Sequence, residues 1–75
     1  MKFDARVDAS GLLCPLPLLK SKRQLNRMQN GEILLLVATD SNAEEDMRKF
    51  CDQSSNELLQ VERLDDAQHL YLRKG

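Results

Sequence analysis

The chain has 75 residues, of which 41% are hydrophobic and 31% are charged, and its net charge is −1. A chain of this length buries only about 60% of its unfolded surface, so we expect one domain over residues 1–75 with a thin core and no deep catalytic pocket. Three aromatic residues disfavour recognition of single-stranded nucleic acid by base stacking, and a single histidine disfavours a metal site with the usual ligand spacings.

The first strand and helix are read from residues 3–30. Residues 3–8 alternate between apolar and polar, which predicts a half-buried strand. Pro15 suits the first position of a helix, where its missing N–H would have no partner, and Pro17 is tolerated in the same turn. Apolar residues then recur at helical spacing, so this helix is amphipathic. Gly31 is a typical C-cap and predicts that the helix ends at Asn30.

The central strand and the second helix follow. Residues 32–39 form a nearly continuous apolar run, which predicts a strand with little solvent on either face. Residues 41–44 fit a capping box, and the acidic residues of the next turn suit the positive end of a helix dipole. This helix is predicted to close at residues 54–56. Its inward stripe consists of Ala43, Met47, Phe50, Cys51 and Ser54.

Residues 58–64 and 69–73 predict two last strands, joined by a turn at residues 65–67. Leu70 and Leu72 are expected to face the helices. The element order is therefore βαβαββ, an α+β fold in which a four-stranded mixed sheet carries two helices on one face as a two-layer α/β sandwich. The first crossover is expected to be right-handed with parallel strands, and the last two strands form a hairpin.

Location is predicted from what the chain lacks. No apolar run approaches the roughly 20 residues needed to cross a bilayer, and residues 1–4 lack the apolar core of a signal peptide. We therefore expect a cytoplasmic protein with no membrane partner. Cys14 and Cys51 are expected to be free thiols, because a reducing compartment disfavours a structural disulfide.

Cys14 stands immediately before the first helix, among the apolar neighbours Leu12, Leu13 and Leu16. The thiolate is the reactive form of cysteine, and a helix N-terminus or nearby cations lower the thiol pKa. We expect this lowering to be modest, because Pro15 and Pro17 remove two N–H donors from the first turn. From the residues alone, an exposed nucleophile and a small buried core residue are equally well supported.

The run from Gly11 to Pro17, Gly-Leu-Leu-Cys-Pro-Leu-Pro, resembles the Gly-Leu-x-Cys-Pro-x-Pro signature of the TusA/SirA family of sulfur carrier proteins. The resemblance extends over residues 3–74 and includes an acidic residue before the glycine. It implies the same two-layer sandwich fold. The residues that would support the cysteine in this motif are Asp8, Gly11, Pro15 and Pro17.

In this family the cysteine of the motif accepts sulfane sulfur as a persulfide and passes it on. The resemblance implies that Cys14 is loaded by a cysteine desulfurase or another sulfurtransferase and unloaded by a downstream sulfur-accepting protein. The sulfur would serve tRNA thiolation, molybdenum cofactor maturation or sulfur metabolism. Such a carrier implies no cofactor and no metal, and it is a sulfurtransferase-type carrier rather than a stand-alone catalyst; a monomer is the default.

Charge is unevenly distributed along the chain. Residues 1–30 hold six basic and two acidic residues, a net charge of +4, whereas residues 31–75 hold five basic and ten acidic residues, a net charge of −5. A basic set on the first helix is a candidate docking face that would steer an acidic partner toward Cys14. A solvated helix face is equally supported. The set consists of Lys20, Lys22, Arg23 and Arg27.

Four other residues were weighed for a role in the site. Cys51 lies on the inward stripe and is predicted to be a core residue rather than a resolving thiol. His69 is predicted to be an exposed surface residue rather than a base. Asp8 and Asp40 are candidates for capping turns near Cys14.

Two other functions compete with sulfur transfer. A non-catalytic RNA-binding or regulatory module would use the basic helix on a small two-layer fold. Scarce aromatic residues and a negative net charge mean that direct nucleic acid binding is not expected. A redox-sensing thiol would require Cys14 and Cys51, which are 37 positions apart, to meet in the fold.

Overall fold

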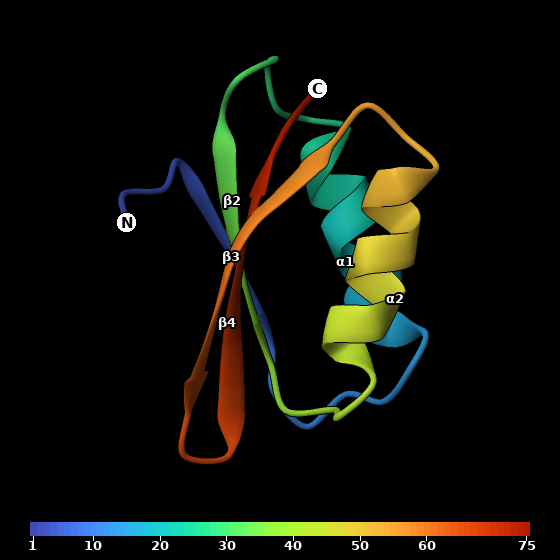
Figure 1. The fold of residues 1–75 in the computed structure, drawn as a ribbon, viewed down its shortest axis with the longest axis vertical. Helices are drawn as coiled ribbons and strands as arrows, with labels where there is room; N and C mark the ends of the chain where they lie inside the picture. Colours follow the sequence, from blue (N-terminus) through green and yellow to red (C-terminus); the bar gives the residue numbers. More distant parts are fainter.

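The structure is a computed structural model that describes residues 1–75. Its elements are β1 (Ala5–Ala9), α1 (Leu16–Leu25), β2 (Ile33–Ala38), α2 (Ala43–Asp52), β3 (Glu57–Leu64) and β4 (Ala67–Arg73). Both helices cover the same face of one sheet (Figure 1). The predicted βαβαββ order and the two-layer architecture are confirmed. Neither helix combines the length and the apolar character that crossing a membrane requires.

The sheet is mixed and has the strand order β1-β2-β4-β3. As predicted, β1 and β2 are parallel, and Ala9 lies opposite Ala38 at their carboxyl ends. β4 runs antiparallel to both β2 and β3. It begins at Ala67, two residues earlier than predicted, so the hairpin turn consists of residues 65–66. β1 and β3 are therefore the two edge strands.

The core lies between the sheet and the helices. Side chains alternate between the faces of a strand, so Leu34 and Leu36 of β2 pack under the helices while Leu35 and Val37 pack on the opposite face. The predicted central strand, buried on both sides, is confirmed. So is the prediction for β4: Leu70 and Leu72 belong to the helix-side core. The helix-side cluster is completed by Ala9, Leu25, Ala38, Ala43, Met47 and Cys51.

α1 differs from its prediction at both ends. Pro15 is the N-cap rather than the first helical residue, and Pro17 occupies the second position, where its missing N–H has no intrahelical partner. The helix ends at Leu25, five residues earlier than predicted. After Leu25 the backbone tightens into a turn, in which the N–H groups of Arg27 and Met28 donate to the carbonyl oxygens three residues earlier at 3.0 Å, and Gly31 is not a cap of this helix. It has a φ of +91°, and its N–H donates to the carbonyl oxygen of Lys74 at 2.7 Å, which leads the chain into β2.

The start of α2 also differs from its prediction. The N-cap is Asn42, which makes no side-chain capping bond, so the predicted capping box is wrong. Instead, the Asp40 carboxylate accepts the N–H of Asn42 at 3.2 Å. The Glu44 carboxylate turns outward to Arg48 at 2.8 Å. Ser54, predicted to face inward, lies beyond the end of the helix and is exposed, because the helix ends at Asp52.

Candidate functional site

The loops that follow β1 and β2 meet at one end of the molecule. The two strands are parallel and end opposite each other. Each is followed by a loop that leads into a helix, so both helix N-termini also lie at this end, the lower end in Figure 1. The carboxyl ends of parallel strands are where α/β sheets commonly place their binding sites. Residues 10–15 and 39–42 form this end.

Two hydrogen bonds between these loops hold the backbone at Cys14. The N–H of Gly11 donates to Oγ1 of Thr39 at 2.8 Å, and the N–H of Cys14 donates to Oδ2 of Asp40 at 2.7 Å. Gly11 has a φ of +79°, which glycine adopts without strain. The bond to Asp40 is charge-assisted and therefore stronger than a neutral one. Asp40 thus stabilises both its own turn and the loop that carries the thiol.

Asp8 stabilises the first turn of the Cys14 loop. Its carboxylate accepts the N–H of Ser10 at 3.0 Å, which confirms the predicted capping role. The hydrogen bonds from Ser10, and after them the positive charges of Arg6 and Lys20, hold the pKa of Asp8 below its usual value. Asp8 therefore remains ionised at neutral pH.

The two prolines fix the backbone on the other side of Cys14. Pro15 is the N-cap of α1, and the peptide bond between Cys14 and Pro15 is cis. The Pro15 carbonyl accepts the N–H of Leu19 at 3.0 Å, and the Pro17 side chain is buried. Cys14 itself is exposed. Of the two alternatives that the residues left open for Cys14, the structure therefore shows the exposed thiol and not the buried core residue.

The thiol of Cys14 is hydrogen-bonded to a carboxylate of the other helix. Its Sγ donates to Oδ2 of Asp46, in the first turn of α2, at 2.7 Å. This hydrogen bond, then partial desolvation, then the negative charges of Asp46 and Asp40 raise the pKa of Cys14. The expected lowering of this pKa is wrong, because the Asp46 carboxylate is hydrogen-bonded to the sulfur and the charges that act on the thiol, those of Asp46 and Asp40, are negative.

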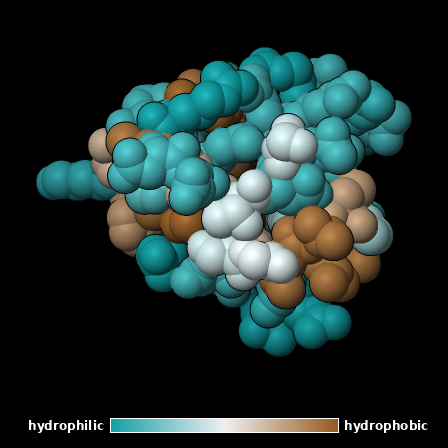
Figure 2. Space-filling model, turned by 90° about the horizontal axis from the view of Figure 1, so that it is seen from below, coloured by the Kyte–Doolittle hydropathy of each residue, from teal (hydrophilic) through white to brown (hydrophobic).

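Exposed leucines surround the thiol. Leu13 is 71% exposed, and Leu16 and Leu19 are also exposed. A hydrophobic patch within mostly hydrophilic surface is visible when the molecule is seen from this end (Figure 2). Leu12 instead packs against the core, so only two of the three predicted apolar neighbours remain available to a partner. A small domain that exposes leucines beside a thiol offers a surface suited to another protein.

Cys51 is a core residue, as predicted. It is 7% exposed and belongs to the helix-side cluster, and burial raises its pKa to about 11. It lies in the last turn of α2, whereas Asp46, which contacts Cys14, lies in the first turn. Five residues of helix separate Cys51 from that contact by about 7.5 Å along the axis. Since Cys51 also faces inward, the fold does not pair the two thiols as a redox couple.

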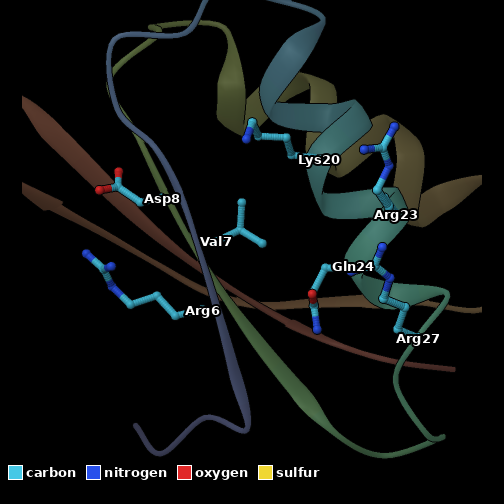
Figure 3. Close-up of a pocket in the computed structure, with 7 residues that line it drawn as sticks. All are labelled: Arg6, Val7, Asp8, Lys20, Arg23, Gln24 and Arg27. Atoms are coloured by element: carbon cyan, nitrogen blue, oxygen red, sulfur yellow. The ribbon is translucent and has the colours of Figure 1, made fainter.

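The predicted docking set divides between two surfaces. Lys20, Arg23 and Arg27 line a groove of about 290 Å³ between α1 and the edge strand β1. Lys22 lies on another side of α1, with its Nζ 5.8 Å from the centre of the Phe50 ring. We call the former surface the basic groove; it is shown in Figure 3 and is lined by Arg6, Val7, Asp8, Lys20, Arg23, Gln24 and Arg27.

Neither His69 nor any acidic cluster forms a further site in the structure. His69 is half-buried in β4, opposite Val37 of β2 and Glu62 of β3, so its predicted exposure is wrong: the neighbouring strands cover it on both sides. No group of three or more His, Cys, Asp or Glu side chains is arranged to hold a metal ion.

Asp46 is the site residue that the sequence analysis did not assign. In the sequence it is one of three acidic residues at the start of a helix, 32 positions after Cys14. The usable signal was topological. Two parallel strands joined through a helix bring the starts of both following helices to the same end of the sheet. An acidic residue in one first turn is then a neighbour of a cysteine that precedes the other.

Several known proteins are similar to this chain over nearly its whole length. The family model described as sulfurtransferase TusA matches residues 5–74. The sulfur carrier protein TusA of Allochromatium vinosum is 40% identical over 73 residues, which are 97% of this chain and 96% of that protein. YrkI of Bacillus subtilis is 33% identical over 75 residues, the full length of both chains. The crystal structure of a SirA-like protein from Desulfitobacterium hafniense has the same fold, with a TM-score of 0.84 at 16% identity over 96% of this chain and 99% of that one.

Proposed function

Because this chain belongs to the TusA family of sulfur carrier proteins, we propose that Cys14 carries sulfane sulfur as a persulfide. The observation that carries the proposal is an exposed thiol, held by two prolines and by Asp40, in a domain without a deep pocket. A carrier needs its reactive atom at the surface, because two different proteins have to reach it in turn. Cys51 is too well buried for that role.

Loading is a thiol exchange at sulfur. The Cys14 thiolate attacks the terminal sulfur of a donor persulfide, the new S–S bond forms on Cys14, and the donor leaves as a thiolate. The proton that Cys14 gives up when its hydrogen bond to Asp46 is broken is taken up by the departing donor thiolate, so the step is balanced. In unloading, a nucleophile of the acceptor attacks the outer sulfur, and Cys14 leaves and recovers its proton. No oxidant or reductant is consumed in either step.

The hydrogen bond to Asp46 keeps the unloaded thiol protonated. A carboxylate beside a thiol disfavours the thiolate, which is the form that oxidants and alkylating agents attack. We infer that the Cys14 thiol of the free carrier is a weak nucleophile as long as this hydrogen bond is present. A partner that brings a positive charge to Asp46, or moves it from the sulfur, would release the thiolate where it is needed.

The donor is a cysteine desulfurase or another sulfurtransferase, and the acceptor is a further sulfur-accepting protein. The exposed Leu13, Leu16 and Leu19 are the contact surface around the thiol for both partners. We propose the cytoplasm as the site of this relay, since a reducing compartment keeps Cys14 from forming disulfides. Thiolated tRNA, the molybdenum cofactor and sulfur metabolism are the candidate destinations of the sulfur.

Intact-protein mass spectrometry after incubation with inorganic polysulfide, or with a cysteine desulfurase and cysteine, tests the proposal. The wild type and Cys51→Ser should each gain the mass of one sulfur atom, and Cys14→Ser should gain none. Cyanide should then release the sulfur as thiocyanate, which separates sulfane sulfur from oxidation. Equal loading of Cys14→Ser and the wild type, or no loading of either, would exclude Cys14 as the carrier.

A further inference from the structure

The basic groove carries positive charge that the chain does not neutralise. All four ion pairs of the protein use basic residues of its second half, namely Arg48, Lys49, Arg63 and Arg73. The four cations of the groove, by contrast, form no ion pair; they are Arg6, Lys20, Arg23 and Arg27. Asp8 is the only carboxylate there, and it is already hydrogen-bonded to the N–H of Ser10. The groove therefore has an excess of positive charge that can attract a negatively charged ligand.

The groove also runs beside a free backbone edge. β1 is an edge strand, paired only with β2. Backbone N–H and C=O groups alternate in direction along a strand, so about half of those of β1 point away from β2 and toward the groove. Such an edge is a template on which an extended peptide adds as a further strand. A bound phosphate or other small anion would leave these groups unused.

The cations lie on both sides of this edge. In Figure 3, Val7 points from β1 toward α1, whereas Arg6 points to the opposite side of the strand. Lys20 and Arg23 approach from α1, and Arg27 approaches from the turn that follows it. A strand added along β1 would present successive side chains alternately toward α1 and toward the side of Arg6. Acidic side chains on either face of that strand would thus meet a cation.

The charge of the groove and its side chains also indicate which kind of ligand it can bind. A second copy of the chain would bring its own groove, with four cations and one carboxylate, against this one, so the charge of the groove favours an added strand of opposite charge. The groove contains no aromatic side chain on which a nucleic acid base could stack. The other half of the chain, with a net charge of −5, would repel a long polyanion. A short acidic peptide fits better than RNA on each of these grounds.

We propose that the basic groove binds an acidic, extended segment of the protein that exchanges sulfur with Cys14, and that this segment adds to the sheet along β1. This assignment rests on the proposed function for the identity of the partner, but the binding itself does not require a persulfide. The geometry places the docked partner close to its target, because β1 continues directly into the loop that carries Cys14, and Lys20 is only six residues beyond the thiol. Arg6, which the sequence analysis left out, joins the docking set, and Lys22 leaves it.

Binding of a fluorescent seven-residue peptide of alternating glutamate and valine, followed by anisotropy and by amide NMR shifts, tests the proposal. We expect binding that weakens as salt is added, with the largest shifts in β1 and α1. The double variant Arg23→Glu/Arg27→Glu should lose at least tenfold in affinity. The matched control Lys49→Glu/Arg63→Glu, with the same change in net charge elsewhere, should bind like the wild type. No binding at millimolar peptide, or equal losses in both variants, would overturn the proposal.

Three further probes separate the alternatives. A peptide with glutamine in place of glutamate should bind at least tenfold more weakly. Two peptides N-methylated at alternate residues test strand addition; at least one should lose binding, and if neither does, the strand model is wrong. An oligouridylate that binds more tightly than the acidic peptide and depends on the same arginines would assign the groove to RNA instead.

Sulfur loading is measured in parallel so that the two proposals fail separately. Cys14→Ser should bind the acidic peptide as the wild type does. Arg23→Glu/Arg27→Glu should still take up sulfur from inorganic polysulfide, because that small donor needs no docking surface. Peptide binding without any loading of Cys14 would support the groove and contradict the carrier role. Loading of Cys14 without peptide binding would support the carrier role and contradict the proposed function of the groove.

Discussion

Cys14 and Cys51 are the same chemical group at opposite ends of the helical layer. Cys14 is exposed before the first turn of α1, and Cys51 is buried in the last turn of α2. Both thiols have a raised pKa, but the causes differ. For Cys14 the main cause is one hydrogen bond to Asp46, and for Cys51 it is burial among apolar side chains.

This difference shows how one fold holds an exposed thiol and a buried thiol in separate environments. The environment of Cys51 changes only if the core opens. The environment of Cys14 depends on one surface side chain, which a partner can displace or neutralise without disturbing the fold. A raised pKa alone therefore does not show that a thiol is inert. A thiol can still react if the group that raises its pKa lies at the surface, where a partner can remove or neutralise it.

The largest expected contrast is in alkylation of the native protein by iodoacetamide. Cys14 should react directly, while Cys51 should react at least about a thousandfold more slowly, because its exposure requires opening of the core. Mass mapping of each cysteine over time measures both rates, and the urea-unfolded protein, in which they should become similar, is the control. Comparable native rates would contradict the burial of Cys51.

The second contrast is in stability. Met47→Ala removes a fully buried side chain beside Cys51 and should lower the free energy of unfolding by about 2–5 kcal/mol. Leu13→Ala, next to Cys14, should change it by no more than about 0.5 kcal/mol, since Leu13 is largely exposed. Urea unfolding followed by circular dichroism compares them. If Leu13→Ala cost as much as Met47→Ala, the leucines around the thiol would belong to the core.

The third contrast concerns pH. The folded protein holds the Cys51 proton more tightly than the unfolded chain does, so the stabilisation from this thiol is complete below pH of about 9 and is lost as the pH rises to about 11. The loss should be about 3 kcal/mol, since one pKa unit corresponds to about 1.4 kcal/mol. Free energies of unfolding over this range, under reducing conditions, should fall more steeply for the wild type than for Cys51→Ala. Parallel curves would show that Cys51 does not titrate with unfolding.

The smallest effect is expected at Asp46. Asp46→Asn removes the charge next to Sγ, so the pKa of Cys14 should fall and alkylation at neutral pH should become several-fold faster. The pH dependence of the iodoacetamide rate measures this. Glu45→Gln is the matched control, because Glu45 is the adjacent carboxylate and pairs with Lys49. An unchanged profile in Asp46→Asn, or equal changes in both variants, would remove Asp46 from the site.

Much of the fold could be predicted because its signals are local. The apolar run of β2, the alternation around Leu70 and Leu72, and the proline-initiated helix all depend on neighbours within a few residues. Gly31 shows where local signals stop. Its position predicts a helix cap, but in the structure it has a positive φ and its N–H donates to the carbonyl oxygen of Lys74, 43 positions away. A glycine in the sequence predicts that the chain turns, but it does not indicate whether the turn ends a helix or leads into a strand.

The amino-acid sequence by itself determined the architecture and the proline-flanked motif that contains Cys14, since these depend on short-range pattern and on a contiguous motif. Only the tertiary structure decided the electrostatics of the thiol and the shape of the docking surface. Asp46 reaches Cys14, and Arg6 joins Lys20, Arg23 and Arg27, through contacts between segments that are distant in the chain. Charge interactions depend on distance in space, and for such segments that distance is fixed only when the sheet and the helices pack together.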